Sequence, residues 1–140
     1  MPRVDLVKAT IWNRQTINEL QALIEQVTPD LIHFHNTFPL ISTSAYHTAK
    51  SFDIPIVQTL HNYRYMCPSA TLFRNGKECH ACIDKKVAIP AIIHKCYRSD
   101  RKATALTATA TAIQRSIKKS FQLVDRFIAL SEHSRRHFER

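Results

Sequence analysis

The chain has 140 residues, of which 44% are hydrophobic and 22% are charged, and its formal net charge is +9. This composition fits one soluble globular domain and excludes a disordered chain. The longest stretch free of Asp, Glu, Lys and Arg, 31–49, holds three histidines, an asparagine and a proline, which excludes a membrane-spanning helix. The chain also opens without the apolar segment of a signal peptide. We therefore expect a cytoplasmic protein, either free or peripheral to a membrane.

The basic charge is concentrated in the last third of the chain. Residues 95–140 contain eleven Lys and Arg against four Asp and Glu, whereas residues 1–94 contain nine against seven, so +7 of the +9 lies after residue 94. A basic segment of this kind suits an anionic partner such as a nucleotide, a nucleic acid or an acidic membrane surface. It equally suits solvated helix faces, and the sequence leaves both interpretations open.

Glycine is almost absent from the sequence. Gly76 is the only one, whereas average usage predicts about ten in a chain of this length. The glycine-rich loops that cradle phosphates need glycine where the backbone closes on the ligand. A nucleotide would therefore have to bind here by other means.

The first half of the chain alternates helix and strand patterns. Apolar residues recur at helical spacing over 14–27 and predict an amphipathic helix. The run DLIHFHN, residues 30–36, is short, apolar and rich in β-favouring residues, which predicts a strand buried on both faces. A short helix over 42–52 and a second strand of the same kind over 55–61 follow.

A long segment without such patterns, residues 62–100, separates these elements from the rest. Residues 101–124 contain no proline or glycine and predict one long helix, and 125–131 predict a third strand. Ser131 is placed to cap a final helix over 132–140. Strands that alternate with helices predict parallel pairing through right-handed crossovers. We expect one partial Rossmann-like α/β domain over 1–140, a three-layer sandwich with about three strands, and a cysteine-containing loop inserted over 62–100. The missing first βα unit predicts a fragment of a larger protein.

Histidine, asparagine and hydroxyl groups follow the predicted strands. The strand ends read HFHN, TLHNYR and ALSEHS, and the dipeptides His35-Asn36 and His61-Asn62 repeat at two of them. In open α/β sheets, ligands bind beyond the carboxyl ends of the strands. Imidazole and amide groups both donate and accept hydrogen bonds, which suits a polyhydroxylated ligand such as a sugar. Each could instead be an ordinary turn residue.

Three other residues of these elements favour structural roles. His33 lies two residues before His35 and deeper in its strand, so we interpret it as a hydrogen-bonded core histidine. Tyr46 and His47 lie on a predicted helix and are interpreted as packing or surface residues.

Four cysteines lie in or near the inserted loop. Cys67, Cys79, Cys82 and Cys96 are separated by eleven, two and thirteen residues. The two-residue spacing of Cys79 and Cys82 lets both thiolates face one tetrahedral ion, and His80 or His94 could replace a cysteine. A structural zinc or iron that orders the loop and a set of four unligated thiols both remain open. The motif does not follow a strand at the start of a helix, which disfavours a redox role, and no catalytic metal is expected.

Several separated motifs resemble one known family. These are PDLIHFHNTFPLISTSAYHTAKSFDIPIVQTLHNYRYMCP, FRNGKECHAC, HKCYRSDR and DRFIALSEHSRRHF, in this order. Together they resemble the amino-terminal domain of family 4 glycosyltransferases, which are retaining enzymes with two Rossmann-like domains (the GT-B fold). The resemblance runs from about residue 10 to the end and includes a cysteine placement found in one subgroup.

The resemblance implies a transferase that moves a sugar from a nucleotide sugar to a glycan or lipid-linked acceptor. It implies that His61 is the catalytic residue that approaches the donor sugar, and that Arg64 could meet a phosphate or an acidic acceptor group. The other residues implied to line the acceptor and donor-sugar cleft are His35, Asn36, Asn62, Tyr63, Ser131 and Glu132.

This sequence departs from the family pattern in two ways. The glycine-rich first loop is missing, and so is the second domain, with its spaced glutamates and its basic residues for the donor diphosphate. We therefore expect an acceptor-side half that is inactive alone, either as a gene fragment or as a chain that depends on a separately encoded second domain.

Two other functions remain open. One is a small metal-stapled basic module that contacts nucleic acid or an anionic membrane, and the other is a remnant without activity. The repeated His-Asn strand ends make nucleic acid the less expected partner, because a nucleic-acid reader would not need them.

Overall fold

The structure is a computed structural model that describes residues 3–139. The chain forms two compact units. The first, called the sheet unit below, comprises the described residues through His61 and those from Lys119 onward. The second, called the cysteine unit, is Asn62–Lys118 and contains all four cysteines. Each unit is described by itself.

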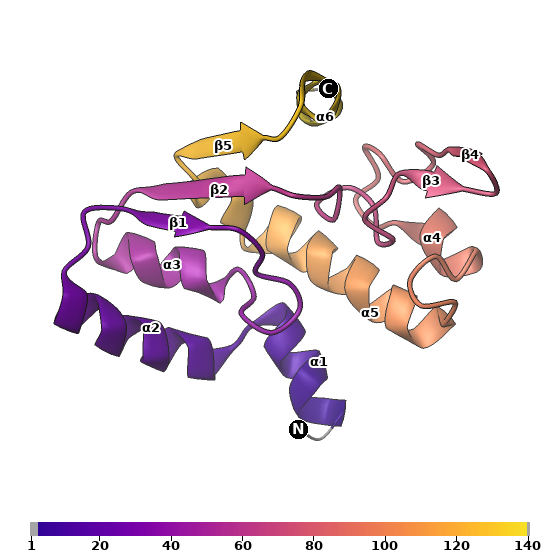
Figure 1. The fold of residues 1–140 in the computed structure, drawn as a ribbon. Helices are drawn as coiled ribbons and strands as arrows, with labels where there is room; N and C mark the ends of the chain where they lie inside the picture. Colours follow the sequence, from indigo (N-terminus) through magenta and orange to yellow (C-terminus); the bar gives the residue numbers. More distant parts are fainter. Residues whose placement is uncertain (1–2, 140) are drawn as a thin grey trace. The chain divides into compact units, whose positions relative to one another are not determined.

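The sheet unit contains three strands and several helices. Its elements are α1 Arg3–Ile11, α2 Arg14–Val27, β1 Ile32–Phe34, α3 Ser44–Ser51, β2 Ile56–Leu60, the 3-10 helix η2 Ser120–Leu123, β5 Arg126–Ala129 and α6 Glu132–Phe138. Helices α2 and α3 lie on the same side of the sheet (Figure 1).

The three strands form one parallel sheet in the order β1-β2-β5. The register pairs Phe34 of β1 with Gln58 of β2, and Leu60 of β2 with Ala129 of β5. The three arrows therefore point the same way, and their carboxyl ends share one edge (Figure 1). The predicted fold class is confirmed: a partial Rossmann-like α/β arrangement around a three-stranded parallel sheet.

Local capping explains why α2 begins and ends where the sequence predicts. The side-chain Oδ1 of Asn13 accepts hydrogen bonds from the backbone N–H groups of Gln15 at 2.9 Å and Thr16 at 3.3 Å, which satisfies two unpaired donors of the first turn. Thr28 stops the helix in a left-handed conformation with φ 46°. The bounds of α2 agree with the predicted 14–27.

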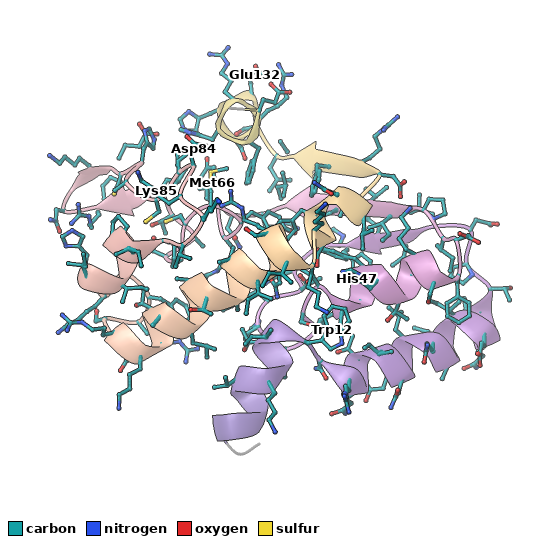
Figure 2. All side chains as sticks on the ribbon, turned by 180° about the vertical axis from the view of Figure 1, so that it is seen from behind. Trp12, His47, Met66, Asp84, Lys85 and Glu132 are labelled. Atoms are coloured by element: carbon teal, nitrogen blue, oxygen red, sulfur yellow. The ribbon has the colours of Figure 1, made fainter. Side chains whose placement is uncertain are left out.

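The core of the sheet unit lies between α3 and the central strand. Tyr46, Ala49 and Ile56 are fully buried there. The ring of Phe34 meets that of Tyr46 edge to face, with 5.1 Å between the centroids. On the same helix His47 packs against Trp12 (Figure 2), with 5.0 Å between the rings, so both α3 residues have structural contacts as predicted.

Two sequence predictions about burial are wrong. Strand β1 was expected to be buried on both faces, but its residues are half-buried or exposed, because β1 is an edge of a narrow sheet. The same expectation is correct for the central strand β2, which is largely buried. His33 was expected in the core, yet it is exposed on edge strand β1. Its hydrogen bond was expected correctly, since its Nε2 lies 2.8 Å from Thr59 Oγ1.

The predicted long helix over 101–124 is wrong in its second half. Asp100 caps the start of helix α5, Arg101–Ala112, because its carboxylate accepts a hydrogen bond from the Ala103 N–H at 2.6 Å. A π-helical turn, η1 Ile113–Ile117, follows, and Lys119 adopts a left-handed conformation with φ 49°. A non-glycine residue in that conformation ends an α-helix, and η2 begins as a separate element.

Residues 62–100 of the cysteine unit were predicted to be a loop, but they contain β3 Phe73–Arg74, β4 Lys77–Glu78 and α4 Ile89–Ile93. Elements α5 and η1 complete the unit. Strands β3 and β4 pair antiparallel across Asn75 and Gly76, whose φ angles are 53° and 77°. Two successive positive φ values are what a tight hairpin turn requires, and Asn-Gly supplies them at the least cost. The only glycine of the chain therefore serves this hairpin.

No helix among residues 3–139 is long and apolar enough to cross a membrane.

Candidate functional site

Two histidines from neighbouring strands meet at the carboxyl edge of the sheet. His35 follows β1, His61 follows β2, and Nδ1 of His35 lies 2.9 Å from Nε2 of His61. Their rings are tilted by 34°, and both side chains are exposed. One ring must donate a proton to the hydrogen bond and the other must accept it, so at least one of these two nitrogens carries no proton. The contact fixes the orientation of both rings while leaving them accessible to a ligand.

His33 extends this pair into a row of three imidazoles. Its ring centroid lies 4.4 Å from that of His35, because residues two apart on a strand share one face. The hydrogen bond with Thr59 holds the far end of the row. The row therefore starts within the sheet and ends at His61.

The buried side-chain amide of Gln58 holds the backbone of His35 in place. Gln58 is only 2% exposed, and its Nε2 donates to the backbone oxygen of His35 at 2.9 Å. Its Oε1 accepts a hydrogen bond from the hydroxyl of Tyr46 at 2.7 Å. A buried amide with satisfied partners is costly to disturb, so this chain from α3 through β2 fixes the position of His35.

Sequence reasoning missed Gln58, although a signal was present. A glutamine in the middle of the apolar run PIVQTLH costs free energy unless it finds partners. That signal could have marked it as a supporting residue of the strand ends.

The two asparagines of the repeated dipeptide both build turns. Asn36 Oδ1 accepts the N–H of Phe38 at 3.2 Å in the sheet unit. Asn62 Oδ1 accepts the N–H of Arg64 at 3.0 Å in the cysteine unit. Each amide oxygen closes a turn over its own backbone two residues on, which gives the repeat a structural explanation beside any ligand role.

Ser131 and Glu132 follow the third strand, at the same edge of the sheet. Ser131 Oγ accepts the Ser134 N–H at 3.1 Å, which confirms the predicted cap of α6. Glu132 bonds to Arg135 at 2.9 Å and to Arg136 at 3.1 Å, and these hydrogen bonds hold its pKa below the usual range. A carboxylate paired in this way stays ionised at neutral pH and accepts hydrogen bonds only.

Tyr63 and Arg64 belong to the cysteine unit and are largely engaged there. The Tyr63 carbonyl accepts the N–H of Cys67 at 2.8 Å. The Arg64 guanidinium donates to the Pro68 carbonyl and stacks 4.8 Å above the ring centroid of Tyr97. Burial lowers the pKa of Arg64 from its ordinary value, but guanidinium remains charged at physiological pH.

A narrow cavity inside the cysteine unit has a basic lining. Arg64, Lys85, Lys86 and Arg115 all contribute to it. Positive side chains gathered around one cavity make it suited to an anionic group.

The four cysteines also gather within their unit. Cys67 and Cys82 are buried, and Cys79 and Cys96 are half-buried. Burial raises the pKa of the Cys82 thiol, and the neighbouring thiols of Cys67, Cys96 and Cys79 raise it further. The four thiols are thus close enough to act on one another electrostatically, although among the described residues no three of their sulfurs lie within 4.8 Å of one another. Sulfur is the donor type that zinc and iron prefer in structural sites, so these residues could hold such an ion.

The chain is similar to one known protein family. The sequence model described as Glycosyltransferase Family 4 matches residues 2–140, nearly the whole chain. The chain belongs to glycosyltransferase family 4. No curated protein and no solved structure matches it.

Family membership confirms the recognition made from the strand-end motifs. The family 4 glycosyltransferase domain brings His35, His61 and Ser131 to one edge of its parallel sheet, each directly after or near the end of a strand. Asn62, Tyr63 and Arg64 fall in the other unit of the same glycosyltransferase chain. The predicted site residues are thus divided between the two units.

Proposed function

We propose that the sheet edge of this domain forms the acceptor side of a sugar-transfer site. The substrates would be a nucleotide sugar and a glycan or lipid-linked sugar acceptor. The observation that supports this most strongly is the contact between His35 and His61 at the carboxyl edge of the sheet. Open α/β sheets bind their ligands at that edge, and exposed imidazoles offer both donors and acceptors to sugar hydroxyls.

The proposed reaction joins an acceptor hydroxyl oxygen to the anomeric carbon of the donor sugar. The bond from that carbon to the diphosphate breaks, and the hydroxyl proton leaves with the departing group or to solvent. In this proposal His61 is the catalytic residue, because it contacts the donor sugar through its exposed ring. His35 is a positioning residue, since it acts on the substrate through the orientation of His61.

We also propose that this chain needs a second domain for turnover. The charge that develops on the departing nucleoside diphosphate must be stabilised by positioned donors or cations. Arg135 and Arg136, which lie in the helix after the third strand, are paired with Glu132, so their charge is already engaged. A donor-binding domain outside these 140 residues would supply the cations, and the 140-residue chain alone should show negligible transfer.

Binding measurements on the purified chain test the site itself. A panel of oligosaccharides is titrated into the wild type, His61→Ala and the control His94→Ala, whose exposed histidine lies in the other unit. The proposal expects saccharide binding that weakens at least tenfold, about 1.4 kcal/mol, in His61→Ala only. Equal saccharide binding by all three proteins would contradict the proposed site. Sugar transfer catalysed by the isolated chain would contradict the proposed need for a second domain.

A further inference from the structure

The four cysteines come from separate turns that the backbone holds in place. The Cys67 N–H bonds to the Tyr63 carbonyl at 2.8 Å, and the Cys79 N–H bonds to the Leu72 carbonyl at 2.7 Å, directly after the β3–β4 hairpin. The Cys96 N–H bonds to the Ala91 carbonyl at 3.0 Å, at the end of α4. A tight hairpin followed by two cysteines with two residues between them is a local geometry that presents two sulfurs to one ion.

The four thiols are anchored separately but act on one another electrostatically. Cys67 and Cys79 act electrostatically on Cys96, and all three act on Cys82. Cys67 and Cys82 also line the same cavity. The thiols of the four cysteines therefore lie in one part of the cysteine unit.

Hydrogen-bond donors surround the sulfur of Cys79. The Ala81 N–H donates a hydrogen bond to this sulfur, and Arg74 adds a side-chain hydrogen bond and its positive charge. Donors that surround a ligand sulfur orient it and tune its charge in metal sites.

The cysteine unit contains strained backbone conformations and little apolar core, and a crosslink would compensate for both. Its non-glycine residues with left-handed backbone include Ala70, Leu72, Asp84, Lys95, Arg98 and Ser99. Such conformations persist only where surrounding structure fixes them. Large apolar side chains of the unit such as Phe73 and Ile93 are exposed, at 57% and 60%, so they add little core. Small units of this kind are commonly stabilised by a metal or by disulfides.

We propose that Cys67, Cys79, Cys82 and Cys96 together bind one zinc ion that crosslinks the turns of the cysteine unit. Sulfurs around a tetrahedral zinc lie about 3.8 Å apart, given a Zn–S distance of about 2.3 Å. Among the described residues, no three of the cysteine sulfurs lie within 4.8 Å of one another, so binding draws them together by rotation of the side chains and small shifts of the turns. This site is independent of the proposed sugar site.

The test begins with the complete chain, purified without chelator, loaded with zinc and then freed of excess ion. Metal content is measured by elemental analysis, and thiols are counted in the denatured protein. Cobalt then replaces zinc, because its absorption spectrum distinguishes four sulfur ligands from three sulfurs and one histidine. Each cysteine is changed to serine in turn, and Met66→Leu serves as a control that removes a neighbouring sulfur outside the proposed ligand set.

We expect one zinc per chain, four thiols and a cobalt spectrum of four thiolates. Each Cys→Ser variant should bind zinc at least tenfold more weakly, and Met66→Leu should bind it like the wild type. If a variant fails to fold, the wild-type cobalt spectrum still decides the ligand set. Less than half a zinc per loaded chain, a loss of thiols to disulfides, or a spectrum with a histidine ligand would each overturn the proposal.

Discussion

Nδ1 of His35 and Nε2 of His61 lie 2.9 Å apart, although 26 positions separate the two residues in the chain. The parallel pairing of β1 and β2 creates this contact, because it places the two strand ends side by side. Each ring restricts the other, and both face solvent. An exposed pair of oriented imidazoles is the feature on which the account of the sugar site depends.

The first prediction concerns the role of His35 in positioning. In His35→Ala, His61 loses its ring partner and should change its tautomer or its side-chain rotamer. The nitrogen chemical shifts of the His61 ring, measured by NMR, should move, while those of His94 should not. Unchanged His61 shifts in a folded His35→Ala variant would show that the contact does not orient His61.

The second prediction concerns Gln58, which supports His35 from within the sheet. Gln58→Leu removes the hydrogen bond to the His35 carbonyl and leaves the buried Tyr46 hydroxyl without its amide partner. The free energy of unfolding, from urea denaturation, should fall by about 1–3 kcal/mol. The exposed Gln26→Leu in α2 is the matched control and should change it by less than about 0.5 kcal/mol.

A double variant tests the mechanism assigned to Gln58. If the Tyr46 hydroxyl acts through Gln58, the loss in Tyr46→Phe combined with Gln58→Leu should be smaller than the sum of the single losses. If the two losses of stability add strictly, the Tyr46 hydroxyl does not act through Gln58.

The third prediction concerns the pH dependence of stability. The Asp125 carboxylate bonds to Lys50 Nζ at 2.6 Å and to the Ile56 N–H at 2.7 Å, and the Lys50 hydrogen bond in particular lowers its pKa. Since the folded pKa lies below the unfolded value of about 3.9, the folded state is stabilised above that pH. This contribution is lost as pH falls through the folded pKa.

Asp125→Asn isolates that contribution. The variant should be less stable than the wild type at pH 7, and the difference should shrink as pH falls below about 4. Asp30→Asn, at an exposed position before β1, is the control and should follow the wild-type profile. A constant difference between Asp125→Asn and the wild type at all pH values would contradict the assignment.

The fourth prediction concerns the hairpin of the cysteine unit. Gly76 has φ 77°, and an added Cβ would meet nothing within 4 Å, so the cost of Gly76→Ala is backbone strain alone. We expect a loss of about 1–2 kcal/mol in the free energy of unfolding. Asn75→Gly should stay within about 0.5 kcal/mol of the wild type, since glycine also accepts positive φ. Equal effects of both changes would argue against the turn assignment.

Local signals in the sequence predicted the regular parts of the fold well. Helix α2 was predicted with its exact bounds, because its apolar spacing and its flanking turn are encoded within a few residues. The cap at Ser131 was also predicted for a local reason: a hydroxyl before an acidic residue suits a helix start. The three strands followed from short β-favouring runs between helices.

Features that depend on tertiary structure were not predictable in the same way. The break of the long helix at Lys119 follows from a left-handed residue within a segment whose composition favours helix. The exposure of His33 follows from the narrowness of the sheet, which the strand sequence does not encode. The hairpin at Asn75 and Gly76, by contrast, carried a recognisable turn signal that sequence reasoning overlooked.

The candidate site shows the same division. The strand-end positions of His35 and His61 followed from the sequence, but the hydrogen bond between their rings depends on strand register and could not. The turn roles of Asn36 and Asn62 involve only their own neighbours, two residues away. The support from Gln58 required knowledge of which helix packs on β2.

The most direct test of the sugar site is an NMR titration that observes the imidazole nitrogens of the histidines. Oligosaccharides and nucleotide sugars are added separately to the isotopically labelled chain. The account predicts that a saccharide shifts the signals of His61 and His35 together, in a saturable way, and leaves His94 unchanged. A titration in which every tested sugar leaves His61 and His35 unmoved would contradict the claim that this sheet edge binds sugar.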